Sequence, residues 1–137
     1  MGVDIERLPD NYGFSMIQLY LIERIINAAN IDLRMTHSRP TPDVGPLLTR
    51  YEYGPETKHD WKYRTLTGIL SYLQGTSRPD ISMATLQCAR FNANTKLCHK
   101  ISVKRICKYL IDTKDKGIIF RPDKTQGLEC HGDADFS

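Results

Sequence analysis

The sequence contains no apolar run long enough to cross a membrane. The longest run, from Met16 to Ile22, is interrupted by Gln18 and ends at Glu23, whereas a membrane-spanning helix needs about 20 mostly apolar residues. Residues 1–7 include acidic side chains where a secretory signal would carry positive charge. We therefore expect a protein of the cytoplasm or nucleus that does not associate with membranes.

The sequence also lacks the short motifs of common nucleotide-binding and hydrolytic sites. It has no glycine-rich phosphate loop, no Gly-X-Ser-X-Gly turn and no His-Glu-X-X-His helix. Its four cysteines are Cys88, Cys98, Cys107 and Cys130. Two of them directly precede a histidine, whereas paired zinc ligands are usually about two to four residues apart. We therefore expect reduced, buried thiols instead of a zinc site or disulfides, with Cys88 and Cys107 as small apolar core residues.

Positive charge is concentrated in one part of the chain. The 137 residues carry a net charge of +3. Residues 96–124 contain nine Lys or Arg and three Asp, a net charge of +6, so the remainder carries −3. Such a basic segment is typical of a surface that contacts phosphate groups, and it is also compatible with a solvated helix face.

Alternating apolar residues predict a β-hairpin at each end. Residues 3–6 and 14–17 flank a turn-forming stretch, 8–13, which predicts an N-terminal hairpin. Residues 118–120 and 128–135 predict a second, C-terminal hairpin.

Apolar residues at helical spacing predict four helices between the hairpins. The first covers residues 18–29, and the second covers 61–73 with Gly75 as its C-terminal stop. The third starts at Pro79, and the fourth follows Thr95 as its cap. The expected buried faces are Leu21, Ile22, Ile25, Ile26 and Ala29 in the first helix, Trp61, Leu66, Ile69, Leu70 and Leu73 in the second, Ile81, Ala84, Thr85, Cys88 and Ala89 in the third, and Ile101, Val103, Ile106, Cys107, Leu110 and Ile111 in the fourth.

The first two predicted helices are joined by a long irregular connection. Residues 30–60 contain four prolines and show no sustained period. A connection of this kind is unusual inside a compact domain, so we expect it to be functional or to lie over other parts of a larger protein.

The fourth predicted helix carries a basic stripe. Lys100, Lys104 and Lys108 recur at i, i+4 and i+8, and Arg105 lies next to them in the sequence. Acidic residues in the same helix are scarce, but Asp112 falls near its C-terminal end, where the helix dipole disfavours negative charge.

Two short groups of charged residues, each containing aspartate, allow more than one interpretation. Arg78 and Asp80 lie at the start of the third helix. They either form an ion pair or interact with the helix dipole there, or they contact a substrate directly. Asp133 and Asp135 share one face of a predicted strand, where they are either a solvent-facing pair or ligands for a hard cation such as Mg²⁺.

Several sequence blocks occur in an order and spacing known from one family. The main blocks are Tyr72-Leu73-Gln74-Gly75-Thr76-Ser77-Arg78-Pro79-Asp80-Ile81, then Ala89-Arg90-Phe91, then Val103-Lys104-Arg105-Ile106 through Tyr109-Leu110, and finally Gly132-Asp133-Ala134-Asp135-Phe136. Shorter ones are Gly2-Val3-Asp4-Ile5 and Thr41-Pro42. Together they resemble the C-terminal part of copia-type retrotransposon reverse transcriptases, and the resemblance covers essentially the whole chain.

The resemblance implies an α+β fold: an N-terminal β-hairpin, a thumb-like bundle of about four helices and a C-terminal β-hairpin that begins a ribonuclease H-like sheet. Residues 1–113 then correspond to the end of the palm and the thumb, and residues 114–137 to the truncated start of the ribonuclease H domain. Asp133 corresponds to the first metal-binding carboxylate of that nuclease.

The resemblance also implies an enzyme whose active sites lie largely elsewhere. The other nuclease carboxylates and the polymerase motif Tyr-X-Asp-Asp do not occur in these 137 residues. Because two-metal chemistry needs several converging carboxylates, we expect Mg²⁺ to act in the parent enzyme and not to bind tightly here. We expect this chain alone to be inactive.

A thumb steadies a nucleic-acid duplex without reading its sequence. By the resemblance, Lys100, Lys104, Arg105 and Lys108 contact the phosphates of an RNA/DNA hybrid or of DNA. The other expected partners are the palm and ribonuclease H segments of the polyprotein. Two further interpretations are a non-enzymatic helical interaction or structural module, and a small metal-dependent enzyme based on Asp133 and Asp135.

Overall fold

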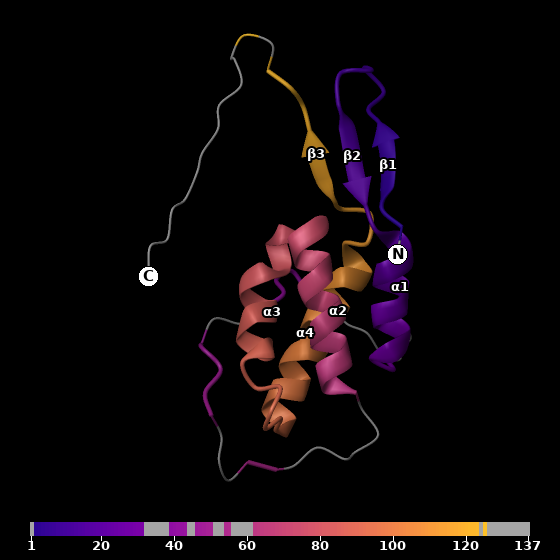
Figure 1. Cartoon of the computed structure of the whole chain (residues 1–137). Coiled ribbons are helices and arrows are strands. Elements are labelled where there is room, and N and C mark those ends of the chain that lie inside the picture. The colour runs from indigo at the N-terminus through magenta and orange to yellow at the C-terminus, as the bar shows by residue number, and fades with distance from the viewer. Residues whose placement is uncertain are drawn as a thin grey trace.

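The computed structural model describes residues 2–31, 39–43, 46–50, 54–55, 62–123 and 125. Over these residues, a small antiparallel sheet stands at one end of a bundle of four α-helices (Figure 1). The mixed α+β layout, with an N-terminal hairpin followed by four helices, confirms the predicted fold class.

The sheet combines two strands from the start of the chain with one from near its end. Strand β1 (Asp4–Arg7) pairs with β2 (Phe14–Ile17), and β2 pairs with β3 (Ile118–Phe120), both in antiparallel register. The N-terminal hairpin and the strand at 118–120 are therefore confirmed. The sequence predicts residues 128–135 as the partner of β3, but they lie outside the described residues, and the observed partner of β3 is β2.

Contacts between β2 and β3 explain this non-local pairing. Phe14 lies opposite Phe120, and their rings stack with centroids 4.9 Å apart. Met16 lies opposite Ile118, so one row of cross-strand pairs is entirely apolar. A Cβ atom at Gly117 would collide with the main-chain oxygen of Met16, so glycine allows the chain to enter β3 this close to β2.

Four α-helices follow in the predicted order. Helix α1 covers Leu19–Ala28 and α2 covers Tyr63–Thr76. A short 3-10 helix at Pro79–Ile81 leads into α3 at Ser82–Ala89, and α4 covers Leu97–Asp112. Pro79 thus occupies the first turn of its helix, where a missing N–H costs nothing.

Two predicted helix ends are wrong. Gly75 lies inside α2, because the N–H groups of the two residues after the helix donate to the Leu73 oxygen, 3.0 Å away, and close its last turn. The residue that caps α4 is Lys96, not Thr95. The Lys96 N–H donates to Nδ1 of His99 at 3.1 Å, so a histidine within the helix satisfies the first free donor.

The helices form a ring around the core, in which α1 and α3 each contact both α2 and α4. The predicted inner faces are largely confirmed, and the fully buried apolar side chains include Leu21, Ile22, Ile25, Leu66, Leu70, Leu73, Ile81, Val103, Ile106 and Leu110.

The clearest exceptions lie on α4. Ile101 is 60% exposed and Cys98 is also exposed, contrary to prediction. Residues two positions apart in a helix point about 200° apart around its axis. Because Val103 faces the core, Ile101 faces away from it. Trp61, expected in the core from α2, lies outside the described residues.

The connection between α1 and α2 runs along α4. Hydrogen bonds between described residues join them, among them Arg39 N to Asp112 Oδ2 (3.1 Å), Arg105 Nη2 to Thr41 Oγ1 (3.0 Å), His99 Nε2 to Thr49 O (3.1 Å) and Leu97 N to Pro55 O (3.0 Å). Along the connection, the partners move from the C-terminal to the N-terminal end of α4, so the two segments are antiparallel. The described parts of the connection therefore lie over a helix of this same chain.

Candidate nucleic-acid interface

The four basic residues that the sequence predicts as phosphate contacts all lie on α4. Lys100, Lys104, Arg105 and Lys108 are each half-buried. Long basic side chains in such positions bury their stems and keep the charged end near water. The basic stripe therefore lies at the surface, as a phosphate-contacting face requires.

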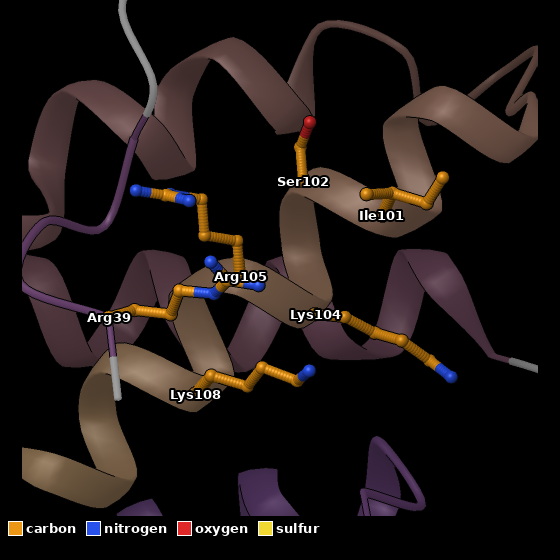
Figure 2. Close-up of a pocket in the computed structure, with 6 residues that line it drawn as sticks. All are labelled: Arg39, Ile101, Ser102, Lys104, Arg105 and Lys108. Atoms are coloured by element: carbon orange, nitrogen blue, oxygen red, sulfur yellow. The ribbon is translucent and has the colours of Figure 1, made fainter. Parts of the chain in front are cut away.

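A pocket of about 310 Å³ opens beside α4. It is lined by Arg39, Ile101, Ser102, Lys104, Arg105 and Lys108 (Figure 2). Among these described residues four carry a positive charge and none a negative one, and we call the site the basic pocket. The structure thus brings together three of the four predicted residues, whereas Lys100 is not among the lining residues.

Arg39 is the member that sequence reasoning missed. It belongs to the connection and precedes Thr41 by two residues, far from the basic stripe in sequence. Figure 2 shows it reaching over α4 from the connection, whereas Lys104 and Lys108 extend from the helix itself. No spacing rule relates residue 39 to residues 104–108, so the sequence contains no periodic signal for this contact.

Arg105 is held by a contact that leaves part of its guanidinium unused. Its Nη2 donates to the Thr41 hydroxyl at 3.0 Å, and that hydroxyl donates to the Asp43 main-chain oxygen at 2.6 Å. The Arg105 Nε is buried and has no hydrogen-bond partner among the described residues. A buried N–H without a partner costs free energy, so the described contacts do not fully satisfy the Arg105 guanidinium.

Asp112 has a role that the sequence does not indicate. Its Oδ2 accepts a hydrogen bond from the Arg39 N–H at 3.1 Å. The helix dipole disfavours a carboxylate at the C-terminal end of α4. The hydrogen bond to Arg39 compensates for this and fixes the connection to the helix.

Arg78 and Asp80 form the predicted ion pair, and its setting shows a structural role. Arg78 is 1% exposed. Its Nε and Nη2 donate to the two Asp80 oxygens at 2.9 and 2.7 Å, and its Nη1 and Nη2 donate to the oxygen and hydroxyl of Thr113 at 2.8 and 2.7 Å. The Tyr109 hydroxyl donates to Asp80 at 2.8 Å. With its donors engaged inside the fold, Arg78 ties the start of the third helix to the end of α4.

The same network shifts the acidity of two of its members. Burial raises the pKa of the Asp80 carboxyl, but the hydrogen bonds from Arg78 and Tyr109 and the Arg78 charge outweigh it and hold that pKa below its usual value. The pKa of the Tyr109 hydroxyl is raised by burial and by its bond to Asp80. Both shifts favour the ionised Asp80 and the neutral Tyr109 that the geometry requires.

The buried thiols behave as predicted. Cys88 and Cys107 are free and buried, and burial raises the pKa of each to about 12. They are therefore protonated at neutral pH and act as small apolar side chains.

The metal-binding prediction falls on a part of the chain that is not described. Asp133 and Asp135 lie outside the described residues, and so does Cys130. Within the described ranges, no three His, Cys, Asp or Glu side chains gather at one place.

No helix in the described part of the chain is both long and apolar enough to span a membrane.

Comparison with known proteins points to mobile genetic elements. Over 137 residues, all of this chain, the sequence is 28% identical to the retrovirus-related Pol polyprotein from transposon RE1 of Arabidopsis thaliana. It is 28% identical over 138 residues to the corresponding polyprotein from transposon RE2 of the same plant. A putative transposon Ty5-1 protein of Saccharomyces cerevisiae is 29% identical over 80 residues, which cover 58% of this chain and 26% of that protein.

These matches support a fragment of a retrotransposon polyprotein. The chain spans only 9% of the length of the two plant polyproteins. No protein-family model matches the chain, and no solved structure matches it. The copia-type subclass, the thumb and the start of ribonuclease H therefore remain predictions.

Proposed function

We propose that this chain is the thumb segment of a copia-type retrotransposon reverse transcriptase, running into the start of its ribonuclease H domain. In this role it binds the phosphate backbone of an RNA/DNA hybrid or DNA duplex through the basic pocket, and it catalyses no reaction alone. The observation that carries the proposal is the convergence of Arg39, Lys104, Arg105 and Lys108 on one pocket that no carboxylate lines among the described residues.

The spacing of these cations suits a phosphate backbone. Lys104 and Lys108 are one helical turn apart, a rise of about 6 Å, whereas phosphates follow one another at about 3.4 Å per strand along the duplex axis. A rise of about 6 Å corresponds to about two phosphate steps, so neighbouring turns of α4 can reach two phosphates of the same strand. Such contacts position a duplex without reading base sequence, which is what a polymerase that copies any template requires.

Mg²⁺ is part of this proposal only through the parent enzyme. The residue expected to bind it, Asp133, lies outside the described residues, and the proposed phosphate contacts of the basic pocket use only the side chains of Arg and Lys. We expect binding to persist in the presence of a chelator.

Fluorescence anisotropy with a labelled RNA/DNA duplex tests the proposal. We expect the double charge reversal Lys104→Glu and Lys108→Glu to reduce affinity by at least about tenfold, because two attractions become repulsions. The matched control is the double charge reversal Arg24→Glu and Arg64→Glu, which makes the same change in net charge at exposed positions of α1 and α2 and should reduce affinity much less.

The competing interpretation is a helical interaction or structural module without nucleic-acid function. It predicts that the double charge reversal changes neither nucleic-acid affinity nor stability. Equal affinity of this variant and the Arg24→Glu, Arg64→Glu control would therefore contradict our proposal. Circular dichroism of each variant establishes that the fold is retained.

A further inference from the structure

We propose that Asp112 is a positioning residue for nucleic-acid binding, and that it acts by holding Arg39 in the basic pocket. On this view, connection residues 39–43 form one wall of the interface. The inference rests on the proposed function, because it names how that same site is assembled.

Hydrogen bonds between described residues fix this part of the connection to α4 across long distances in the sequence. The Asp112 carboxylate accepts from the Arg39 N–H, 73 residues away, and the Thr41 hydroxyl accepts from Arg105, 64 residues away. Both bonds lie beside the pocket that Arg39 and Arg105 line. The Asp112 bond uses the main chain of Arg39, which leaves its guanidinium available to the pocket.

Prior fixation of Arg39 matters because ordering a flexible segment upon binding costs free energy. A cation that is already held at the pocket loses less of this entropy when a phosphate arrives. Asp112 therefore promotes anion binding although its own charge repels anions. Its hydrogen bond and its charge act in opposite directions, and this opposition makes the inference testable.

The alternative is that the connection covers the basic pocket. Thr41 occupies one guanidinium nitrogen of Arg105, so on this alternative residues 39–43 compete with a phosphate. Release of the connection would then raise affinity, whereas our proposal requires that release lower it.

The test compares Asp112→Ala with Asp112→Asn by fluorescence anisotropy on the RNA/DNA duplex. Both variants remove the negative charge, but only asparagine retains an oxygen that can accept the Arg39 N–H. We expect Asp112→Asn to bind as well as the unaltered protein or better, and Asp112→Ala to bind more weakly than Asp112→Asn. Loss of one phosphate contact lowers the salt slope by about 0.9, which is about a threefold change in relative affinity between about 50 and 200 mM salt.

The Arg39→Ala background shows whether Asp112 acts through Arg39. There, the difference between alanine and asparagine at position 112 should disappear, because the cation that the bond positions has been removed. A merely structural role of Asp112 would leave that difference unchanged. Equal or tighter binding of Asp112→Ala relative to Asp112→Asn would overturn the inference.

A measurement on the free protein separates this inference from the proposed function. Amide hydrogen exchange at Arg39 should be slow in the unaltered protein and in Asp112→Asn, and faster in Asp112→Ala. Identical exchange in all three would overturn the positioning role even if the duplex binds. Slowed exchange without any duplex binding would instead refute the proposed function and, with it, the role of Asp112 in binding.

Discussion

At the scale of single residues, Arg78 shows how burial decides between two functions of a cation. Its place at the start of the third helix allows either an ion pair with Asp80 or a direct contact to a substrate. In the structure its side chain is buried and bonded to Asp80 and Thr113. Because these hydrogen bonds use the guanidinium donors of Arg78, the side chain is not available to bind a ligand. The basic residues of α4, by contrast, stay half-buried.

Removal of Arg78 should destabilise the protein strongly. We expect Arg78→Ala to lower the free energy of unfolding by about 2–3 kcal/mol, because it breaks a buried hydrogen-bond network and leaves the Thr113 oxygen without this donor. Urea unfolding measures the change. As a control, Arg64→Ala on the exposed side of α2 should remain within about 0.5 kcal/mol of the unaltered protein. A similar effect of the two substitutions would contradict the network.

Asp80 should make stability depend on pH in the acid range. Its folded-state pKa lies below the ordinary value of 3.8, so the unfolded chain takes up the proton first as pH falls. The stabilisation is therefore fully present above about pH 5 and is lost as pH falls through the folded-state pKa.

The variant Asp80→Asn serves as the reference for this effect. The difference in unfolding free energy between it and the unaltered protein should be constant from about pH 5 to 7 and shrink below about pH 4. Thermal or urea unfolding across this range provides the measurement. A difference that grows on acidification would show that the shift has the opposite sign.

At the scale of elements, the helices could be predicted because their stripes are local. The stripe of Leu21, Ile22 and Ile25 on α1 is buried as expected. The ends were harder to predict, because Gly75 is a typical stop signal and yet α2 continues past it to Thr76. Apolar character alone also misplaced Ile101, which lines the basic pocket instead of the core.

Two glycines with different surroundings should respond oppositely to alanine. At Gly117 an added Cβ would meet the main chain of Met16, so Gly117→Ala should destabilise the pairing of β2 with β3. At Gly75 nothing lies within 4 Å of that position. Since alanine is the better helix former, Gly75→Ala should stabilise by about 0.5–1 kcal/mol. Denaturant unfolding of both variants tests the pair, and a shift of the same sign would contradict the description of their surroundings.

At the scale of the whole molecule, the candidate site depends on contacts that no local pattern predicts. The basic stripe of α4 can be recognised in the sequence because lysine recurs at every fourth position. Three of the four residues predicted to contact phosphate line the basic pocket. Arg39 joins them only because the connection folds back along α4, through bonds that span 64 and 73 residues. The same is true of β3, whose observed partner comes from the opposite end of the chain. Periodicity reveals which face an element presents, but it does not reveal which distant segment covers it.

The salt dependence of duplex binding reports how many phosphates the protein contacts. We propose phosphate contacts by Arg39, Lys104, Arg105 and Lys108, so a plot of log Kobs against log salt concentration on a DNA duplex should have a slope of about −3.6. Lys108→Gln should reduce its magnitude by about 0.9, and duplexes of different sequence should give the same slope. Binding that is absent, or that does not change with salt, would contradict the account.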